Sequence, residues 1–237
     1  MGAADSGHEP SGAVLRRVPG VPESRLTAAD AARLPSTTPA PPWDATVDAV
    51  LWTHRATAAA TAALPRGVRP RRVARFAVAG FVRYHATPVG AYDELLASPT
   101  LVRGGLWRLH VPLIAVDSLA SLQAGRAHWA LPKSLAEFSG APAGSCALQA
   151  RGVGWSVRVA VASRGPGNVP ALLRVSLAQV RPDGDVITIP VTCRGPAQVA
   201  RVAVTVDGAP SFADWLRPGR HLGVVLRGVR LRLGSPR

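Results

Sequence analysis

The sequence predicts an α+β domain, in which a β-rich, barrel-like antiparallel or mixed sheet carries a few short helices. Three observations support this fold class. After position 46, short stretches of β-favouring residues are separated by glycine, proline and aspartate. Stretches of strong helix formers are few and short. Near the C-terminus, Val229, Leu231 and Leu233 alternate with Arg230 and Arg232, which is the period of a strand with one buried face.

Eight segments fit the strand pattern, because each combines β-favouring residues with turn residues at its ends. They are residues 47–53, 73–84, 106–116, 153–162, 172–180, 186–192, 199–206 and 222–233. The turn Pro182-Asp183-Gly184-Asp185 predicts a hairpin between the fifth and sixth of these strands.

Four short helices are expected. Residues 56–64 and 91–97 are rich in alanine and leucine, which favour helix. A helix at residues 118–124 is expected to be capped by Asp117. A further short helix at residues 27–34 has Thr27 or Ser24 as its cap.

The chain is expected to divide into an arm and one domain. Residues 1–42 are rich in alanine, proline, serine and glycine and end with Pro39-Ala40-Pro41-Pro42, which indicates a flexible or surface-wrapping N-terminal arm. Residues 43–237 hold the predicted strands and form the single domain. With 237 residues, 47% of them hydrophobic, the chain can bury a core without disulfides.

The net charge of +14 raises the question of nucleic-acid binding. The arginines are scattered along the chain, and the cluster Arg66, Arg69, Arg71, Arg72 and Arg75 has no aromatic residues between its members that could stack on bases. No nucleic-acid partner is therefore expected.

Neither a signal peptide nor an apolar run long enough to span a membrane is expected, so the sequence predicts a cytoplasmic protein without a membrane partner. The histidines lack the spacing of metal ligands, so no metal site is expected.

Lys133 is the only lysine among 28 basic residues, and the others are all arginine. An amine can lose its proton and form an imine, whereas a guanidinium does neither. Every near neighbour in Trp129-Ala130-Leu131-Pro132-Lys133-Ser134-Leu135-Ala136 except Ser134 is apolar. Burial there would lower the pKa of the lysine and leave a free, nucleophilic amine. The alternative is a lysine whose stem covers apolar surface while its head meets water.

Glu94 is the second candidate catalytic residue and one of four glutamates. It lies in Gly90-Ala91-Tyr92-Asp93-Glu94, and a carboxylate beside an imine can stabilise it or move protons. The alternative is a glutamate in the first turn of a helix that complements the helix dipole.

The two segments together resemble the acetoacetate decarboxylase family. Its Gly-x-Tyr-x-Glu segment supplies an active-site glutamate, and its Gly-Arg-Glu-x-x-x-x-Pro-Lys-Lys-Leu segment supplies a Schiff-base lysine. The corresponding residues here are Gly90-Ala91-Tyr92-Asp93-Glu94 and Gly125-Arg126-Ala127-His128-Trp129-Ala130-Leu131-Pro132-Lys133-Ser134-Leu135, in the same order and with the same spacing.

The resemblance implies that Lys133 condenses with the ketone of a β-keto acid such as acetoacetate, and that the iminium accepts the electrons released as carbon dioxide leaves. Glu94 would be its electrostatic or proton-handling partner. It also implies a cone-like barrel, assembly into a homo-oligomer, and no metal or organic cofactor. Trp129 is a candidate to line the substrate pocket, and the alternative for it is core packing. His128 is a candidate proton donor.

The sequence departs from the family pattern at three points. Ser134 replaces the second lysine, Ala127 replaces the glutamate after Gly-Arg, and the arginine expected before the first strand is missing from Trp43-Asp44-Ala45-Thr46. Arg55, Arg83 or Arg126 would then have to bind the substrate carboxylate. Two alternatives stay open. One is an aldolase or dehydratase that acts on other keto acids through the same lysine, and the other is a non-catalytic small-ligand binding protein.

Overall fold

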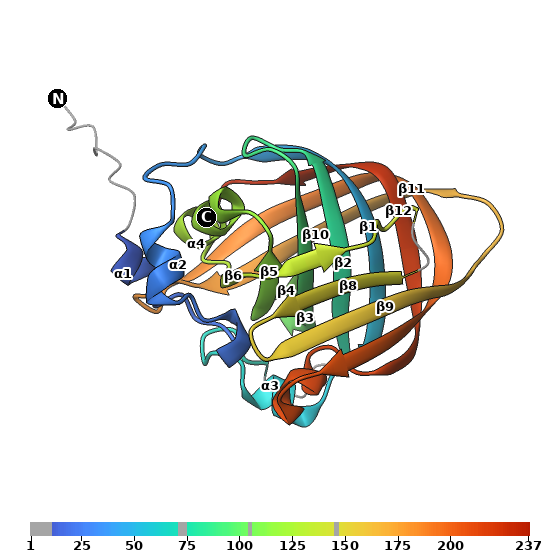
Figure 1. Cartoon of the computed structure of the whole chain (residues 1–237), viewed down its shortest axis with the longest axis horizontal. Coiled ribbons are helices and arrows are strands. Elements are labelled where there is room, and N and C mark those ends of the chain that lie inside the picture. Colours follow the sequence, from blue (N-terminus) through green and yellow to red (C-terminus); the bar gives the residue numbers. More distant parts are fainter. Residues whose placement is uncertain (1–10, 71–74, 104–105, 145–146) are drawn as a thin grey trace.

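The computed structural model describes residues 11–70, 75–103, 106–144 and 147–237 (Figure 1). Within these residues, twelve strands form one sheet. The strands are β1 (Trp43–Arg55), β2 (Phe76–Ala86), β3 (Tyr92–Arg103), β4 (Leu106–Leu109), β5 (Leu113–Val116), β6 (Lys133–Leu135), β7 (Glu137–Ser139), β8 (Ala147–Gly152), β9 (Trp155–Arg164), β10 (Val169–Val180), β11 (Val186–Asp207) and β12 (Gly219–Leu233). The helices are α1 (Gly12–Leu15), α2 (Ala28–Ala32), α3 (Ala58–Ala62) and α4 (Leu119–Trp129), with 3₁₀ turns η1 (Pro22–Ser24) and η2 (Pro210–Asp214).

The sheet is mixed, which is one of the two arrangements that the sequence predicts. Neighbouring strands follow the order β10-β4-β3-β2-β1-β12-β11-β9-β8-β7, and β10 also pairs with β11. Hydrogen bonding therefore returns to the strand at which the order begins, so the pairings form a closed circuit. Most pairs are antiparallel, whereas β10–β4 and β5–β6 are parallel. The predicted hairpin joins β10 to β11, with Val180 opposite Val186.

The predicted helix at residues 91–97 is wrong, because these residues lie in the first half of β3. Tyr92 and Glu94 point to one face of the sheet, whereas Leu95 and Ala97 belong to an apolar core on the other. Pairing with β2 on one side and β5 on the other satisfies the backbone groups of this segment. These tertiary hydrogen bonds outweigh the helix propensity of alanine and leucine.

Three smaller differences concern strand and helix ends. Segment 106–116 forms two strands, β4 and β5, and segments 186–192 and 199–206 form one long strand, β11. Ser118, not Asp117, caps α4, because its side chain accepts a hydrogen bond from the Ser121 amide. Residues 73–74 of a predicted strand, and Arg71 and Arg72 of the basic cluster, lie outside the described residues.

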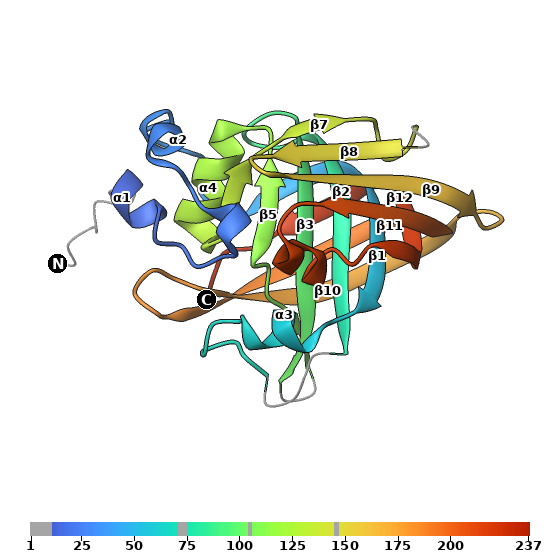
Figure 2. The same ribbon diagram turned by 60° about the horizontal axis from the view of Figure 1, so that its bottom comes forward.

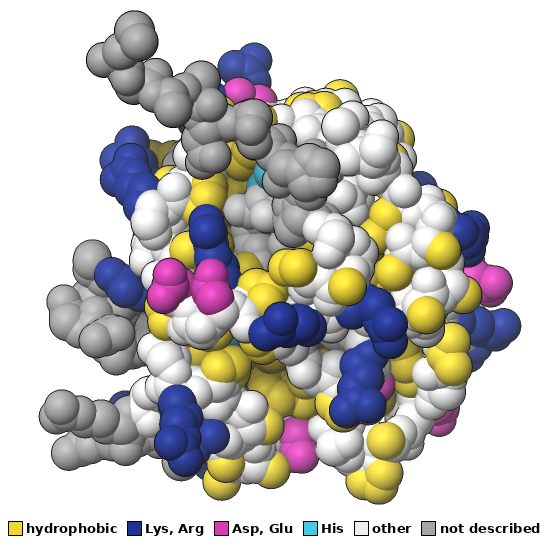
Figure 3. Space-filling view, turned by 90° about the vertical axis from the view of Figure 1, so that its left-hand side faces the viewer, with side chains coloured by type: hydrophobic (Ala, Val, Ile, Leu, Met, Phe, Trp, Pro, Cys, Tyr) yellow, Lys and Arg dark blue, Asp and Glu magenta, His cyan; other side chains and the backbone are white. Residues whose placement is uncertain are grey.

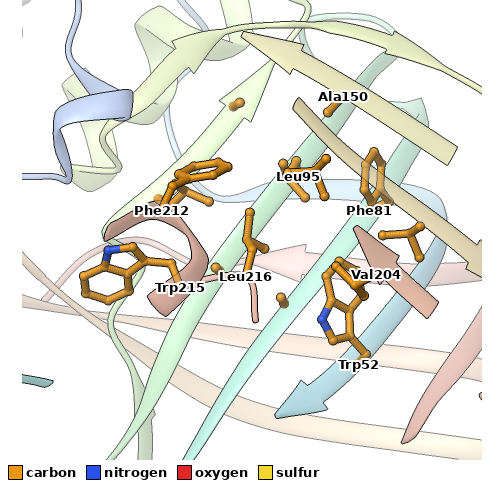
Figure 4. Packing of buried hydrophobic residues seen from close by; sticks show 14 of the residues in the cluster. Trp52, Phe81, Leu95, Ala150, Val204, Phe212, Trp215 and Leu216 are labelled. Carbon is orange, nitrogen blue, oxygen red and sulfur yellow. The ribbon is translucent and has the colours of Figure 1, made fainter. Parts of the chain in front are cut away.

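One apolar cluster lies inside the sheet and joins side chains of β1, β2 and β3 to side chains of β8 and β9, which belong to the same sheet. Trp52 of β1, Phe81 of β2 and Leu95 of β3 lie in this cluster, and Phe212 of η2 packs into it (Figure 4). All four side chains are buried. This cluster fixes the register of β1, β2 and β3, since a slip of one residue would turn these side chains to the opposite face.

The described part of the predicted arm, residues 11–42, packs at the end of the sheet where α4 lies (Figure 2). Tyr92 of β3 and Leu122 of α4 share one cluster with Leu15 and Leu26 of this segment. Four apolar side chains of the segment are buried: Leu15, Val18, Val21 and Leu26. Burial of this kind stabilises by about 1.5–3 kcal/mol per side chain. The division of the chain into an arm and one domain stays a prediction.

None of the helices in the described residues has the length and hydrophobicity that a membrane span requires. At the end of the molecule where α1, α2 and α4 lie, basic side chains are spread among hydrophobic and acidic ones (Figure 3).

His110 is buried without a hydrogen-bond partner for its Nε2 among the described residues, whereas its Nδ1 lies 2.8 Å from the Ala178 carbonyl oxygen. Burial lowers the pKa of His110 to about 4, from an ordinary value of 6.5. As pH falls from about 6.5 to 4, the unfolded chain binds a proton that the native chain does not, so stability decreases by up to about 1.4 kcal/mol per pH unit.

We expect His110→Gln to make stability less dependent on pH in this range, because glutamine does not titrate. Denaturant unfolding at pH 7, 6 and 5 measures the free energy of unfolding of both proteins. Equal slopes against pH in the two proteins would contradict the prediction.

Candidate functional site

Lys133 is held against α4 by a sharp reversal of the chain. The helix ends at Trp129, and Ala130 adopts a left-handed conformation with φ of 50°. The Leu131 amide then donates a hydrogen bond to the Gly125 carbonyl oxygen at 2.9 Å, which folds the chain back along the helix. The Lys133 stem crosses Gly125 so closely that a Cβ there would lie 2.6 Å from Lys133 Cδ. Glycine at this position makes room for the lysine.

Glu94 reaches the lysine from the middle of β3. Lys133 Nζ donates to Glu94 Oε2 at 2.9 Å, and the two side chains are only 5% and 4% exposed. The structure therefore brings together the two residues that the sequence singles out. Because the Lys133 head is buried, the alternative in which it meets water is wrong.

The side chains of Ser121, Tyr84 and Tyr92 complete the site. We call these three residues, together with Lys133 and Glu94, the lysine site. Ser121 Oγ, in α4, accepts a hydrogen bond from Lys133 Nζ at 2.8 Å. Tyr84 OH donates to Glu94 Oε1 at 3.1 Å. Lys133 Nζ lies 5.0 Å from the centre of the Tyr92 ring, which stacks on Tyr84.

Sequence reasoning missed Ser121 and Tyr84 as members of the lysine site. Tyr84 lies directly opposite Tyr92 in the β2–β3 pairing, so the correct strand assignment of β3 would have found it. Ser121 had no comparable signal, because its place depends on the packing of α4 against β6.

The pKa of Lys133 is raised above its ordinary value. Burial disfavours the charged ammonium and by itself lowers the pKa, but the Glu94 carboxylate and Tyr92 act in the opposite direction and outweigh it. The resting site therefore holds an ammonium paired with a carboxylate, not the free amine that the apolar neighbours in sequence indicate.

The two tyrosines keep their protons. Burial raises the pKa of Tyr84 and of Tyr92, and the Glu94 charge adds to this effect for both. Tyr84 is thus a hydrogen-bond donor that holds one oxygen of Glu94 while Lys133 Nζ holds the other.

Arg126 lies behind the lysine and binds the backbone. Its Nε, Nη1 and Nη2 atoms donate to the carbonyl oxygens of Lys133, Leu15 and Ser24 at 2.5–2.8 Å. Burial lowers the pKa of Arg126 to about 10. These contacts give Arg126 a structural role that joins the N-terminal segment to β6, and its predicted role in binding substrate stays a prediction.

Trp129 lies in an apolar cluster with Trp43 and Ile114. Its Nε1 donates to the Gly234 carbonyl oxygen at 2.9 Å, and its ring meets Trp43 edge to face with 5.0 Å between centres. His128 Nε2 lies 3.0 Å from Thr38 Oγ1. The structure thus supports the core-packing alternative for Trp129, while roles in substrate binding or proton donation stay predictions.

The other candidate partners of a substrate carboxylate lie elsewhere. Arg83 donates to both oxygens of Asp93 at 2.8 and 2.6 Å, and Asp93 points to the face of β3 opposite Glu94. Arg55 is exposed at the end of β1. In the described part of the chain, no three histidine, cysteine, aspartate or glutamate side chains are grouped to hold a metal ion.

No protein-family model and no curated protein sequence matches the chain, whereas several solved structures do. The enduracididine biosynthesis enzyme MppR complexed with pyruvate aligns with a TM-score of 0.65 and 20% identity, covering 85% of this chain and 91% of that one. An acetoacetate decarboxylase aligns with a TM-score of 0.57 and 13% identity, covering 90% and 97%. The acetoacetate decarboxylase of Legionella pneumophila aligns with a TM-score of 0.55 and 13% identity, covering 100% and 97%.

The chain has the acetoacetate decarboxylase-like fold. This confirms the fold that the two sequence motifs imply. Identities of 13–20% establish the fold and leave the reaction to be argued from the lysine site itself.

Replacing Gly125 tests how closely the helix and the lysine stem approach. Glycine to alanine in a helix interior ordinarily stabilises by about 1 kcal/mol. We expect Gly125→Ala to destabilise the protein by about 1–3 kcal/mol instead, because the new methyl overlaps Lys133 Cδ. Denaturant unfolding measures the change in the free energy of unfolding.

The matched control is the same substitution in a Lys133→Ala background, which lacks the overlapping atoms. The destabilisation by Gly125→Ala should disappear there. An equal effect in both backgrounds would show that the overlap with Lys133 is not its cause.

Proposed function

We propose that the protein is an enzyme that forms an imine between Lys133 Nζ and the carbonyl group of a small substrate. The observation that carries this proposal is the buried contact of 2.9 Å between Lys133 Nζ and Glu94 Oε2. An amine is the side chain that condenses with a carbonyl, and a carboxylate at hydrogen-bond distance can take its proton.

Glu94 acts first as a base in this proposal. It accepts a proton from the Lys133 ammonium, and the free amine then attacks the carbonyl carbon. Glu94 returns this proton to the oxygen of the adduct, which leaves as water after a second proton has moved from nitrogen to oxygen. Tyr84 keeps the carboxylate in place, and Ser121 keeps Nζ in place.

The iminium supports two reactions, since it accepts electrons from a bond next to the former carbonyl carbon. One is decarboxylation of acetoacetate or a related β-keto acid, which releases carbon dioxide and a ketone. The other is an aldol or dehydration reaction. The direct contact of Glu94 with Nζ favours the second, because aldol chemistry needs a base beside the imine to remove a proton from carbon. One MppR structure is complexed with the condensation product of pyruvate and imidazole 4-carboxaldehyde, so a protein of similar fold binds the product of a carbonyl condensation.

Reductive trapping tests the imine directly. Incubation with a panel of ketones, aldehydes and keto acids in the presence of borohydride should add the mass of the reduced substrate to the intact protein. The chain has one lysine, so Lys133 and the N-terminal amine are the only amines that can react.

The control for trapping is Lys133→Ala, which should lose the adduct completely. An adduct that persists in Lys133→Ala, or no adduct with any compound, would contradict imine chemistry at Lys133. Retained ligand binding without an adduct would instead favour the non-catalytic binding protein.

Glu94→Gln tests what sets the protonation state of the lysine. The Glu94 charge raises the pKa of Lys133, so its removal should lower that pKa and leave more free amine at a given pH. Acetylation of Lys133 by acetic anhydride, measured by intact mass, should therefore begin at lower pH than in the unchanged protein.

The matched control for this profile is Glu137→Gln, which removes the charge of an exposed glutamate on β7. It should leave the pH profile of Lys133 acetylation where it was. A profile that moves equally in both variants, or in neither, would contradict the assigned role of Glu94.

A further inference from the structure

The charges of the lysine site are balanced before any substrate binds. Lys133 and Glu94 neutralise each other across 2.9 Å. Among the described residues, the buried lysine, arginine, aspartate and glutamate side chains are those of Lys133, Glu94 and Arg126. Each of the three guanidinium nitrogens of Arg126 already donates to a backbone carbonyl oxygen. The groups that act on the charge of Lys133 are Glu94 and Tyr92.

The strand positions around the lysine site are apolar. Lys133 pairs with Ile114 across β5–β6, and Ile114 pairs with Leu96 across β3–β5. Glu94 pairs with Val82 on one side and Val116 on the other. A substrate that approaches Nζ along this face of the sheet therefore meets hydrocarbon, the uncharged hydroxyl groups of the lysine site and one carboxylate.

We propose that the lysine site takes an uncharged carbonyl compound, an aldehyde or a ketone, and discriminates against α- and β-keto acids, in which a carboxylate is attached to the carbonyl carbon or lies one carbon away. The inference rests on the imine chemistry proposed above. It names the substrate class of the same site and selects the aldol-type reaction over decarboxylation.

The reason for this preference is the net charge of the lysine site before and after the imine forms. The Nζ–C bond forms, the C–O bond breaks, and the oxygen leaves as water with two protons from the ammonium. The iminium keeps one positive charge, which Glu94 continues to neutralise when the substrate is uncharged. A substrate carboxylate would bring a second anion into a buried site with one cation, close to Glu94, and this is unfavourable at low dielectric.

A pair of substrates of the same shape tests the proposal. Acetoacetamide carries an uncharged amide where acetoacetate carries a carboxylate. Each compound is incubated with the protein and cyanoborohydride at pH 7, and intact mass follows the Lys133 adduct over time. The rate of adduct formation should be at least tenfold higher with acetoacetamide than with acetoacetate. The adduct with acetoacetate is counted together with its decarboxylated form, and Lys133→Ala gives the background from the N-terminal amine.

Glu94→Gln provides the matched variant, because it removes the anion while keeping the shape of the side chain. Both labelling rates can fall when the base is lost, so the ratio between the two compounds is the readout. The preference for acetoacetamide should fall at least tenfold in this variant, whereas it should stay unchanged in Glu137→Gln.

The outcomes separate this inference from the function on which it rests. Labelling by acetoacetate that equals or exceeds labelling by acetoacetamide would overturn the proposed substrate class and leave imine chemistry intact. An unchanged ratio in Glu94→Gln would overturn the electrostatic reason for the preference. No Lys133 adduct with either compound or with the wider carbonyl panel would overturn the imine function itself.

Discussion

A buried ammonium beside a buried carboxylate is the constraint on which the lysine site depends. Either charge alone would be strongly unfavourable at this depth, so Lys133 and Glu94 require each other. Their 2.9 Å contact joins β6 to β3, which are not neighbours in the sheet and are linked through β5. Ser121 and Tyr84 satisfy further hydrogen-bonding capacity of the pair. The ion pair thus fixes the position of Lys133 Nζ as well as its charge.

The surrounding fold places this pair through close contacts on α4. Gly125 lets the lysine stem pass against the helix, and the neighbouring Arg126 ties the Lys133 carbonyl oxygen to the carbonyl oxygens of Leu15 and Ser24. The N-terminal segment is therefore part of the support of the site, since it packs against α4 and Arg126 joins it to β6. Two adjacent helix positions thus position the lysine, one by lacking a side chain and one by donating hydrogen bonds.

The electrostatics bear on how the lysine becomes a nucleophile. A lysine can be activated by desolvation or by a nearby cation, both of which lower its pKa. Here a serine follows the lysine, and the carboxylate raises the pKa. In the proposed function, activation then requires proton transfer within the Lys133–Glu94 pair at the moment of attack. In the proposed substrate preference, the charge of the same carboxylate acts on the substrate as well as on the lysine.

Sequence alone determined much of this protein: the sheet-rich fold class, most strands, the hairpin at residues 182–185, and the pairing of the single lysine with Glu94 as candidates. Local patterns carry the fold class, the strands and the hairpin, because alternation and turn residues act within a few positions. The pairing of Lys133 with Glu94 rests instead on the resemblance of two motifs to the acetoacetate decarboxylase family. It did not determine that residues 91–97 form a strand, since hydrogen bonds to β2 and β5 decide this. Nor did it determine the charge of Lys133. That charge depends on a carboxylate 39 residues away in sequence, and only the tertiary structure decided that it lies within hydrogen-bond distance.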